Sequence, residues 1–94
     1  MSDKEKILSL LNRYSHTVDG GDIEGFAALY DKGAWYVADS PPNRGSKELL
    51  DNVGSKVIIY EDGTPRTRHV NANIELEIDE KAGTATGQRY VTVL

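Results

Sequence analysis

Residues 69–94 read "HVNANIELEIDEKAGTATGQRYVTVL", and this segment indicates the class of fold. Apolar and polar residues alternate without interruption over residues 69–79, which is the period of a half-buried strand. The residues "EKAG" (80–83) favour a turn, and residues 84–94 have the composition of a second strand. The segment therefore predicts an antiparallel hairpin with a four-residue loop, in which Asp79 pairs with Thr84.

This register predicts which side chains share a face of the hairpin. It places Asn73 opposite Tyr90, Asn71 opposite Thr92 and His69 opposite Leu94. One face is then polar and carries His69, Asn71, Asn73, Gln88, Tyr90 and Thr92. The other face is apolar and carries Val70, Ala72, Ile74, Leu76, Val91 and Val93. The polar face either meets solvent or lines a polar pocket, and a bulge between His69 and Val70 would exchange the faces.

The chain before the hairpin has helical patterns. Ser2 or Asp3 can cap a helix over residues 4–19, with Glu5 near the capping-box position, and Gly20 and Gly21 end it. The expected buried arc of this helix consists of Ile7, Leu8, Leu10, Leu11, Tyr14, Ser15 and Val18.

A second helix is expected over residues 23–33, where Asp22 forms the cap and Phe26, Leu29 and Tyr30 face inward. "AWYVA" (34–38) is a short strand, and residues 39–46 form a loop because two prolines disfavour regular structure. Ser46 caps a third helix over 47–60 that Gly54 can interrupt, and a turn or loop follows over 61–67. Helices followed by strands predict an α+β fold, with residues 1–94 as one domain.

Composition limits the classes of function. The chain has 94 residues, a net charge of −4 and no basic run, which argues against nucleic acid and an anionic membrane as partners. It has no cysteine, which excludes thiolate chemistry and disulfides and is compatible with the cytoplasm. The N-terminus does not resemble a signal peptide, and no apolar run is long enough to span a bilayer. The two histidines and scattered acids lack the spacing of a metal site.

The first helix offers Tyr14 to the interior and Asp19 at the edge of the buried arc, whereas His16 points to solvent. Tyr14 is either a core aromatic residue with one polar contact or part of a site, and Asp19 is either a helix-end residue or its partner. His69 on the polar hairpin face is the third candidate.

The order and spacing of these residues resemble a known family. The segments that carry the resemblance are "ILSLLNRYSHTVDGGDIEGFAALYDKGAWYV", "GSKELL" and "TRHVNANIELEID" with "GTATGQRYVTVL". They are similar to the SnoaL-like branch of the nuclear transport factor 2-like superfamily, which includes ketosteroid isomerase, scytalone dehydratase, polyketide cyclases and bile-acid dehydratase. The resemblance implies a cone-shaped curved sheet wrapped around helices, with a pocket in its mouth. Members normally continue through further strands, so the sheet is expected to be short at its C-terminal end.

The resemblance also implies roles for particular residues. Tyr14 and Asp19 would face His69, with His69 as a general base, Asp19 fixing its tautomer and Tyr14 hydrogen-bonding the developing charge. This chemistry needs no metal and no organic cofactor. The residues expected to contact a small hydrophobic ligand are Phe26, Tyr30, Trp35, Val37, Asn71, Asn73 and Tyr90.

The sequence is compatible with three functions. The first is a cofactor-independent lyase or isomerase that acts on a hydrophobic, carbonyl-bearing substrate such as a steroid or a polyketide-like ring. The second is a pocket that binds small molecules without turnover, and the third is an assembly module. Residues 88–94 form a strand of high β propensity in which only Arg89 is charged, so a homodimer through the sheet is expected.

Overall fold

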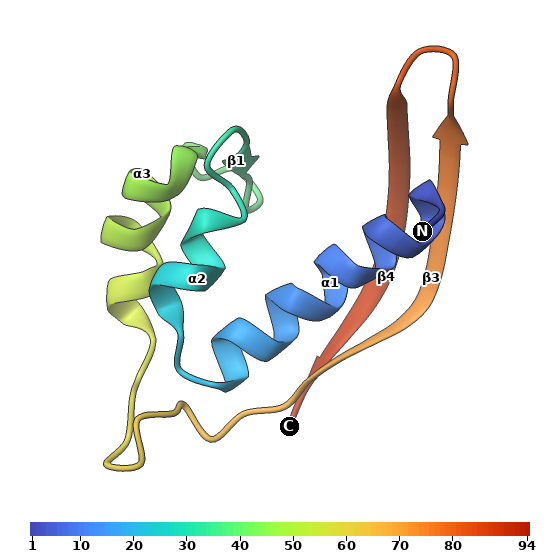
Figure 1. Cartoon of the computed structure of the whole chain (residues 1–94). Coiled ribbons are helices and arrows are strands. Elements are labelled where there is room, and N and C mark those ends of the chain that lie inside the picture. The colour runs from blue at the N-terminus through green and yellow to red at the C-terminus, as the bar shows by residue number, and fades with distance from the viewer.

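The computed structural model describes all residues from Met1 to Leu94 and divides them into a helical part and a long hairpin (Figure 1). The helical part comprises α1 (Asp3–Asp19), α2 (Ile23–Ala28), α3 (Gly45–Asn52) and the 3₁₀ turn η1 (Gly54–Lys56). Two short strands, β1 (Ala34–Trp35) and β2 (Asn43–Arg44), form a small ladder within it. The hairpin consists of β3 (His69–Asp79) and β4 (Thr84–Val93). The predicted α+β class is confirmed.

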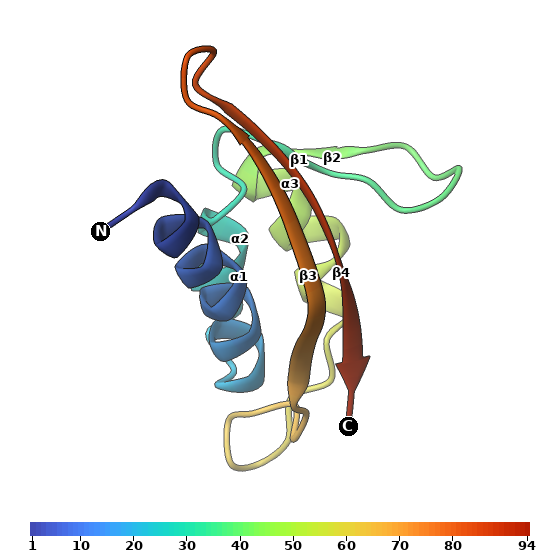
Figure 2. The ribbon, with the colours of Figure 1, turned by 90° about the vertical axis from the view of Figure 1, so that its right-hand side faces the viewer.

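The expected cone-shaped sheet is not formed. The strands make two separate two-stranded sheets, β1 with β2 and β3 with β4, and no barrel closes. The hairpin is long and curved, and it passes over α1 on one side only (Figure 2). A two-stranded ribbon cannot surround the helices, because closure requires every strand to have two neighbours.

The sequence explains the limits of α1. The Ser2 hydroxyl accepts a hydrogen bond from the Glu5 backbone N–H (3.2 Å), and the Glu5 carboxylate accepts one from the Ser2 backbone N–H (3.5 Å), which completes the predicted capping box. Gly21, with a φ of 80°, follows the end of the helix. Leu10 was expected in the buried arc but is 49% exposed, because the elements that pack on α1, namely β3 and α2, do not cover it.

Between α1 and the hairpin, several boundaries differ from expectation. The second helix ends at Ala28 and the third at Asn52, and residues 57–60 are not helical. A side chain at Gly54 would come within 2.7 Å of the Ile23 side chain, so this glycine allows α2 and the turn after α3 to approach closely. The strand at 34–38 is limited to two residues. Its partner β2 lies in the expected loop, where it begins directly after the prolines that cannot donate ladder hydrogen bonds.

The hairpin follows the predicted register only as far as its middle. Asp79 pairs with Thr84 as expected, and the same register continues to Glu75 opposite Gln88. A bulge then places Asn73 and Ile74 within β3 opposite a single residue of β4, and Asn73 has a φ of 53°.

The bulge shifts the rest of the hairpin by one residue. Tyr90 therefore lies opposite Ala72 rather than Asn73, and Val91 lies opposite Asn71. His69 lies opposite Val93 rather than Leu94. The less exposed face of β3 combines His69 and Asn71 on one side of the bulge with apolar residues on the other, namely Ile74, Leu76 and Ile78.

The hydrophobic core lies among the helices, away from the far end of the hairpin. Its buried apolar members are Val18, Phe26, Ala27 and Leu49. Tyr14, Tyr30 and Trp35 are partly buried and pack against this cluster. None of the helices combines the length and the apolar character that crossing a membrane would require.

Candidate functional site

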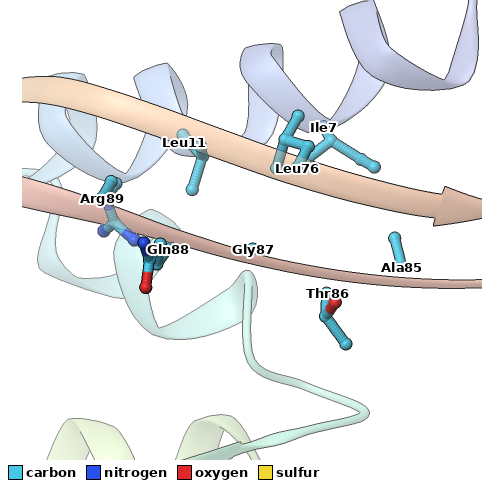
Figure 3. Close-up of a pocket in the computed structure, with 8 residues that line it drawn as sticks. All are labelled: Ile7, Leu11, Leu76, Ala85, Thr86, Gly87, Gln88 and Arg89. Carbon is cyan, nitrogen blue, oxygen red and sulfur yellow. The ribbon is translucent and has the colours of Figure 1, made fainter.

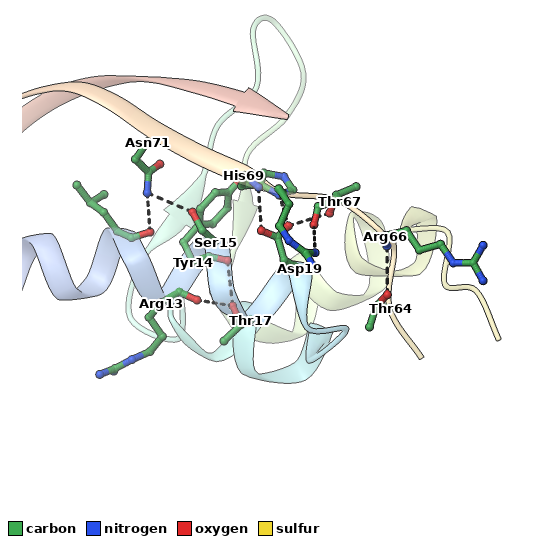
Figure 4. A network of polar contacts seen from close by, with 12 residues as sticks. Arg13, Tyr14, Ser15, Thr17, Asp19, Thr64, Arg66, Thr67, His69 and Asn71 are labelled. Carbon is green, nitrogen blue, oxygen red and sulfur yellow. Dashed lines mark hydrogen bonds and ion pairs between the residues drawn. The ribbon is translucent and has the colours of Figure 1, made fainter. Parts of the chain in front are cut away.

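Asp19 and His69 meet where the last residue of α1 contacts the first residue of β3 (Figure 4). The His69 ring nitrogen Nδ1 lies 2.6 Å from Asp19 Oδ1, and the His69 backbone N–H donates to Asp19 Oδ2 at 2.8 Å. The hydroxyl of Thr67 donates to Oδ1 at 2.8 Å. Both side chains of the pair are only 12% exposed. The carboxylate of Asp19 thus joins the end of the helix to the start of the strand.

The contacts of Asp19 stabilise its ionised form. Burial by itself would raise the pKa of the Asp19 carboxyl, but the hydrogen bonds from the His69 backbone, the His69 ring and the Thr67 hydroxyl lower it, and so does the charge of His69. The net effect is a pKa below the ordinary value of 3.8. Asp19 is therefore a carboxylate at neutral pH.

Tyr14 packs on the other side of the histidine ring. Its ring lies edge-to-face with that of His69, with centroids 5.6 Å apart and an interplanar angle of 85°. Burial raises the pKa of the Tyr14 phenol, the charge of Arg89 lowers it, and the charge of Asp19 raises it, with a raised pKa as the result. The phenol is therefore a hydrogen-bond donor at neutral pH.

Two polar groups of the site, His69 Nε2 and the Tyr14 hydroxyl, lie outside the hydrogen bonds around Asp19. Asp19 occupies Nδ1 of His69, so Nε2 is the ring nitrogen that can accept a proton. The polar network of Figure 4 involves the backbone carbonyl of Tyr14 but not its hydroxyl. An oriented imidazole beside a free phenol suits proton transfer at a carbon next to a carbonyl group.

Asn71 and Arg89 extend the site along the hairpin. Asn71 Nδ2 donates to the Leu11 carbonyl and to the Ser15 hydroxyl, each at 3.1 Å, and Asn71 Oδ1 accepts from Arg89 Nε at 2.9 Å. The Arg89 guanidinium lies 5.3 Å from the centroid of the Tyr14 ring. Asn71 therefore links Arg89 to α1, and its expected contact with a ligand stays a prediction.

Thr67 and Arg89 also contact these residues, and no sequence pattern predicts a role for either. The one available signal for Arg89 is that it is the only charged residue in residues 84–94. The expected register gave no reason to place it beside Tyr14, because the bulge that puts His69 and Asn71 on the same face as Arg89 was not located.

The expected aromatic residues form one cluster with Tyr14. Trp35 contacts Phe26 and Tyr30 with ring centroids 5.6 and 5.4 Å apart, and Tyr14 lies 5.7 Å from Phe26 and 6.1 Å from Trp35. The indole Nε1 of Trp35 is buried and has no hydrogen-bond partner. Burial also raises the pKa of the Tyr30 phenol, the charge of Tyr14 adds to this, and Arg89 opposes it.

Three expected ligand contacts do not join this group. Val37 is 50% exposed and follows the end of β1, on the segment that leads to Pro41 and Pro42. Asn73 is exposed at the bulge, and Tyr90 is 71% exposed on the outer face of the hairpin. The one-residue shift explains why Asn73 and Tyr90 are exposed, since it separates them from the face of the hairpin that carries His69.

Other sequence expectations concern His16 and metal ions. His16 is exposed on α1, which confirms its predicted direction. No group of three or more histidine, cysteine, aspartate or glutamate side chains comes together in a way that could hold a metal ion.

Comparisons with known proteins give one match. Neither the curated proteins nor the solved structures contain a match to the chain. A family model described as a SnoaL-like domain matches residues 1–94. The chain therefore belongs to the SnoaL-like domain family, within the nuclear transport factor 2-like superfamily.

Proposed function

We propose that the chain is a cofactor-independent lyase or isomerase that removes a proton next to a carbonyl group. The proposed substrate is a small hydrophobic cyclic molecule such as a steroid or a polyketide. The family supports the class of reaction, because the superfamily includes isomerases and dehydratases. The observation that carries the proposal is the Asp19 carboxylate 2.6 Å from Nδ1 of His69, with Tyr14 against the same ring.

The proposed reaction begins with the transfer of a proton from the substrate carbon to Nε2 of His69. The electron pair of the broken C–H bond moves into the carbonyl group and forms an enolate, while Asp19 stabilises the imidazolium. The Tyr14 hydroxyl hydrogen-bonds the enolate oxygen. In an isomerase, the imidazolium returns the proton to another carbon. In a dehydratase, the enolate expels a β-hydroxyl group, which takes the proton and leaves as water.

Exchange of carbon-bound hydrogen for deuterium tests this proposal without knowledge of the substrate. A cyclic enone in deuterated water would be followed by proton NMR in the presence of the protein. We expect His69→Ala to lower the exchange rate by about 10²–10⁴-fold, the usual contribution of a positioned general base. Asp19→Asn and Tyr14→Phe should lower it as well.

The matched control is His16→Ala, which removes the other imidazole of the chain from an exposed position on the same helix. Exchange that persists at the wild-type rate in His69→Ala would refute the assignment of the base. The absence of exchange in the wild-type protein would refute proton abstraction for that class of ketone.

Binding of a small molecule without turnover is the second candidate. The observation in its favour is that Tyr30 and Trp35, which are only partly buried, place their rings beside that of Tyr14. A bound enone that shifts the NMR signals of these residues but exchanges no deuterium would support this candidate over catalysis.

A further inference from the structure

Arg89 is a half-buried cation without an acidic partner. Its only side-chain hydrogen bond runs from Nε to the Asn71 amide oxygen, and it takes part in none of the ion pairs of the chain. Both terminal amino groups of the guanidinium are therefore outside the hydrogen-bond network. Partial removal of a charge from water is costly unless a counter-charge or an aromatic face compensates. The Tyr14 ring supplies the aromatic face, and the counter-charge is missing.

A pocket of about 280 Å³ opens beside Arg89, between the first half of α1 and the hairpin (Figure 3). Ile7 and Leu11 of α1 and Leu76 of β3 form its apolar side, and residues 85–89 of β4 form the rest. This volume is close to the lower end of the range for small-molecule sites. The pocket therefore suits a compact ligand.

The position of Gly87 contributes to the shape of this pocket. A Cβ atom there would lie 2.7 Å from Leu76 Cδ2 and 2.8 Å from the Glu75 carbonyl oxygen. The absence of a side chain thus lets Leu76 lie against the backbone of β4, where it lines the pocket.

The lining of the pocket carries a single positive charge and no acidic residue. Arg89 is the only charged residue among those that line the pocket. Glu75 and Glu77 line an adjoining groove that shares residues 86–88 with it, and Asp79 and Glu80 line another that shares Ile7 and Ala85. Asp19 has its oxygens engaged by His69 and Thr67. The pocket therefore combines an apolar body with one uncompensated positive charge.

We propose that this pocket binds a small organic carboxylate, whose apolar body packs on Ile7, Leu11 and Leu76 and whose carboxylate pairs with Arg89. The planar guanidinium matches the two oxygens of a carboxylate, and such charge-assisted hydrogen bonds are stronger than neutral ones. The pocket adjoins the candidate functional site, because Arg89 also contacts Tyr14, but neither Asp19 nor His69 lines it, so carboxylate binding does not depend on the proposed proton transfer.

The test compares two probes of equal shape, cyclohexanecarboxylate and cyclohexanecarboxamide. Each would be titrated into the ¹⁵N-labelled chain, and the backbone amide signals of residues 85–89 would be followed by NMR. We expect saturable shifts there at millimolar carboxylate, and an affinity at least about tenfold weaker for the amide.

Three variants assign this preference to particular residues. Arg89→Gln should remove the preference for the carboxylate, and Arg89→Lys should retain part of it because the charge remains. Arg13→Gln is the matched control, because Arg13 is an exposed arginine of α1 that does not line the pocket. If Arg89→Gln fails to fold, the wild-type comparison of the probes and the lysine variant still test the site.

His69→Ala separates this proposal from proton abstraction. It should lower the rate of deuterium exchange by about 10²–10⁴-fold yet leave carboxylate binding within about twofold of the wild type. The proposal is overturned if the two probes bind equally, if Arg89→Gln keeps the preference, or if no shifts occur at residues 85–89.

Discussion

The carboxylate of Asp19 accepts most of the hydrogen bonds that hold the candidate site together. It accepts hydrogen bonds from the backbone and the ring of His69 and from the Thr67 hydroxyl, across a sequence separation of about fifty residues. Hydrogen bonds to a charged group contribute more than neutral ones, and their donors lose a partner when the group is removed. The same residue therefore orients the proposed base and fastens the hairpin to α1.

Asp19→Asn should lower the free energy of unfolding by about 1–3 kcal/mol near neutral pH. The pKa of Asp19 is lowered by folding from its ordinary 3.8, so its stabilisation is complete above that value and is lost as the pH falls through the lower, folded-state pKa. The difference between wild type and variant should therefore shrink in strong acid. Urea denaturation over a pH series measures it, and a difference independent of pH would contradict this account.

His16→Ala provides the comparison on the same helix. The His16 side chain is exposed, so its removal should change the free energy of unfolding by less than about 0.5 kcal/mol. Binding of any ligand should be unaffected. A larger loss would mean that α1 presents a different face to the hairpin.

Within the hairpin, the bulge at Asn73 and Ile74 determines which side chains reach α1. On the loop side, alternation turns Leu76 and Ile78 inward, and past the bulge it turns His69 and Asn71 inward. Without the extra residue, one of these pairs would face solvent. The polar site and the apolar packing surface can therefore share one face.

Asn73→Val tests the bulge, because the φ of 53° at Asn73 suits asparagine and glycine but not a β-branched residue. We expect Asn73→Val to lower the free energy of unfolding by about 1–2 kcal/mol and Asn73→Gly to leave it nearly unchanged. Thermal unfolding of both variants gives the comparison. Equal stability of the two would show that the left-handed conformation is not required.

Gly87→Ala tests the close approach of the two strands. The new methyl group would clash with Leu76 and with the Glu75 carbonyl oxygen, so we expect a loss of about 1–3 kcal/mol. Gly33→Ala is the matched control, since a methyl group there meets nothing within 4 Å and should cost less than about 0.5 kcal/mol. Equal effects in urea denaturation would argue against tight packing at Gly87.

At the scale of the whole molecule, the hairpin leaves much apolar surface uncovered. Only 7 of 94 residues are buried, and β4 pairs with β3 along one edge alone. Tyr90, Val93 and Leu94 are 71%, 54% and 75% exposed. An unpaired edge of this kind is a template for another strand. The expected homodimer through the sheet therefore remains our prediction.

Sedimentation equilibrium at micromolar concentration tests this assembly. We expect a two-fold dimer with residues 88–94 at or near the interface, and Tyr90→Lys should weaken it. Tyr36→Lys is the matched control, because Tyr36 is a similarly exposed tyrosine, at 67%, outside the hairpin. A well-folded monomer with Tyr90–Leu94 open to solvent would refute the prediction.

Local patterns in the sequence were enough to predict α1 and the loop end of the hairpin. The Ser2–Glu5 capping box, the double glycine after Asp19 and the period-two alternation from Glu75 to Asp79 each depend on residues close together in the chain. For this reason α1 and the loop end of the hairpin were predicted nearly to the residue. Tyr14, Asp19 and His69 entered as a group through the family resemblance, since no local pattern relates α1 to β3.

The position of the bulge in β3 and the place of Arg89 in the site depend on tertiary structure alone. Without the bulge at Asn73, strict alternation would turn either His69 or Leu76 toward α1, but not both. With the bulge, His69 contacts Asp19 and Leu76 lines the same pocket as Ile7 and Leu11. Alternation by itself is continuous through this segment and gives no place for the extra residue. Arg89 lies on the face of β4 that also carries Ala85 and Gly87, and the bulge in β3 brings Asn71 onto the same side, where it holds Arg89 beside Tyr14. Such a choice depends on contacts between distant segments, which do not exist until the helices and the hairpin pack together.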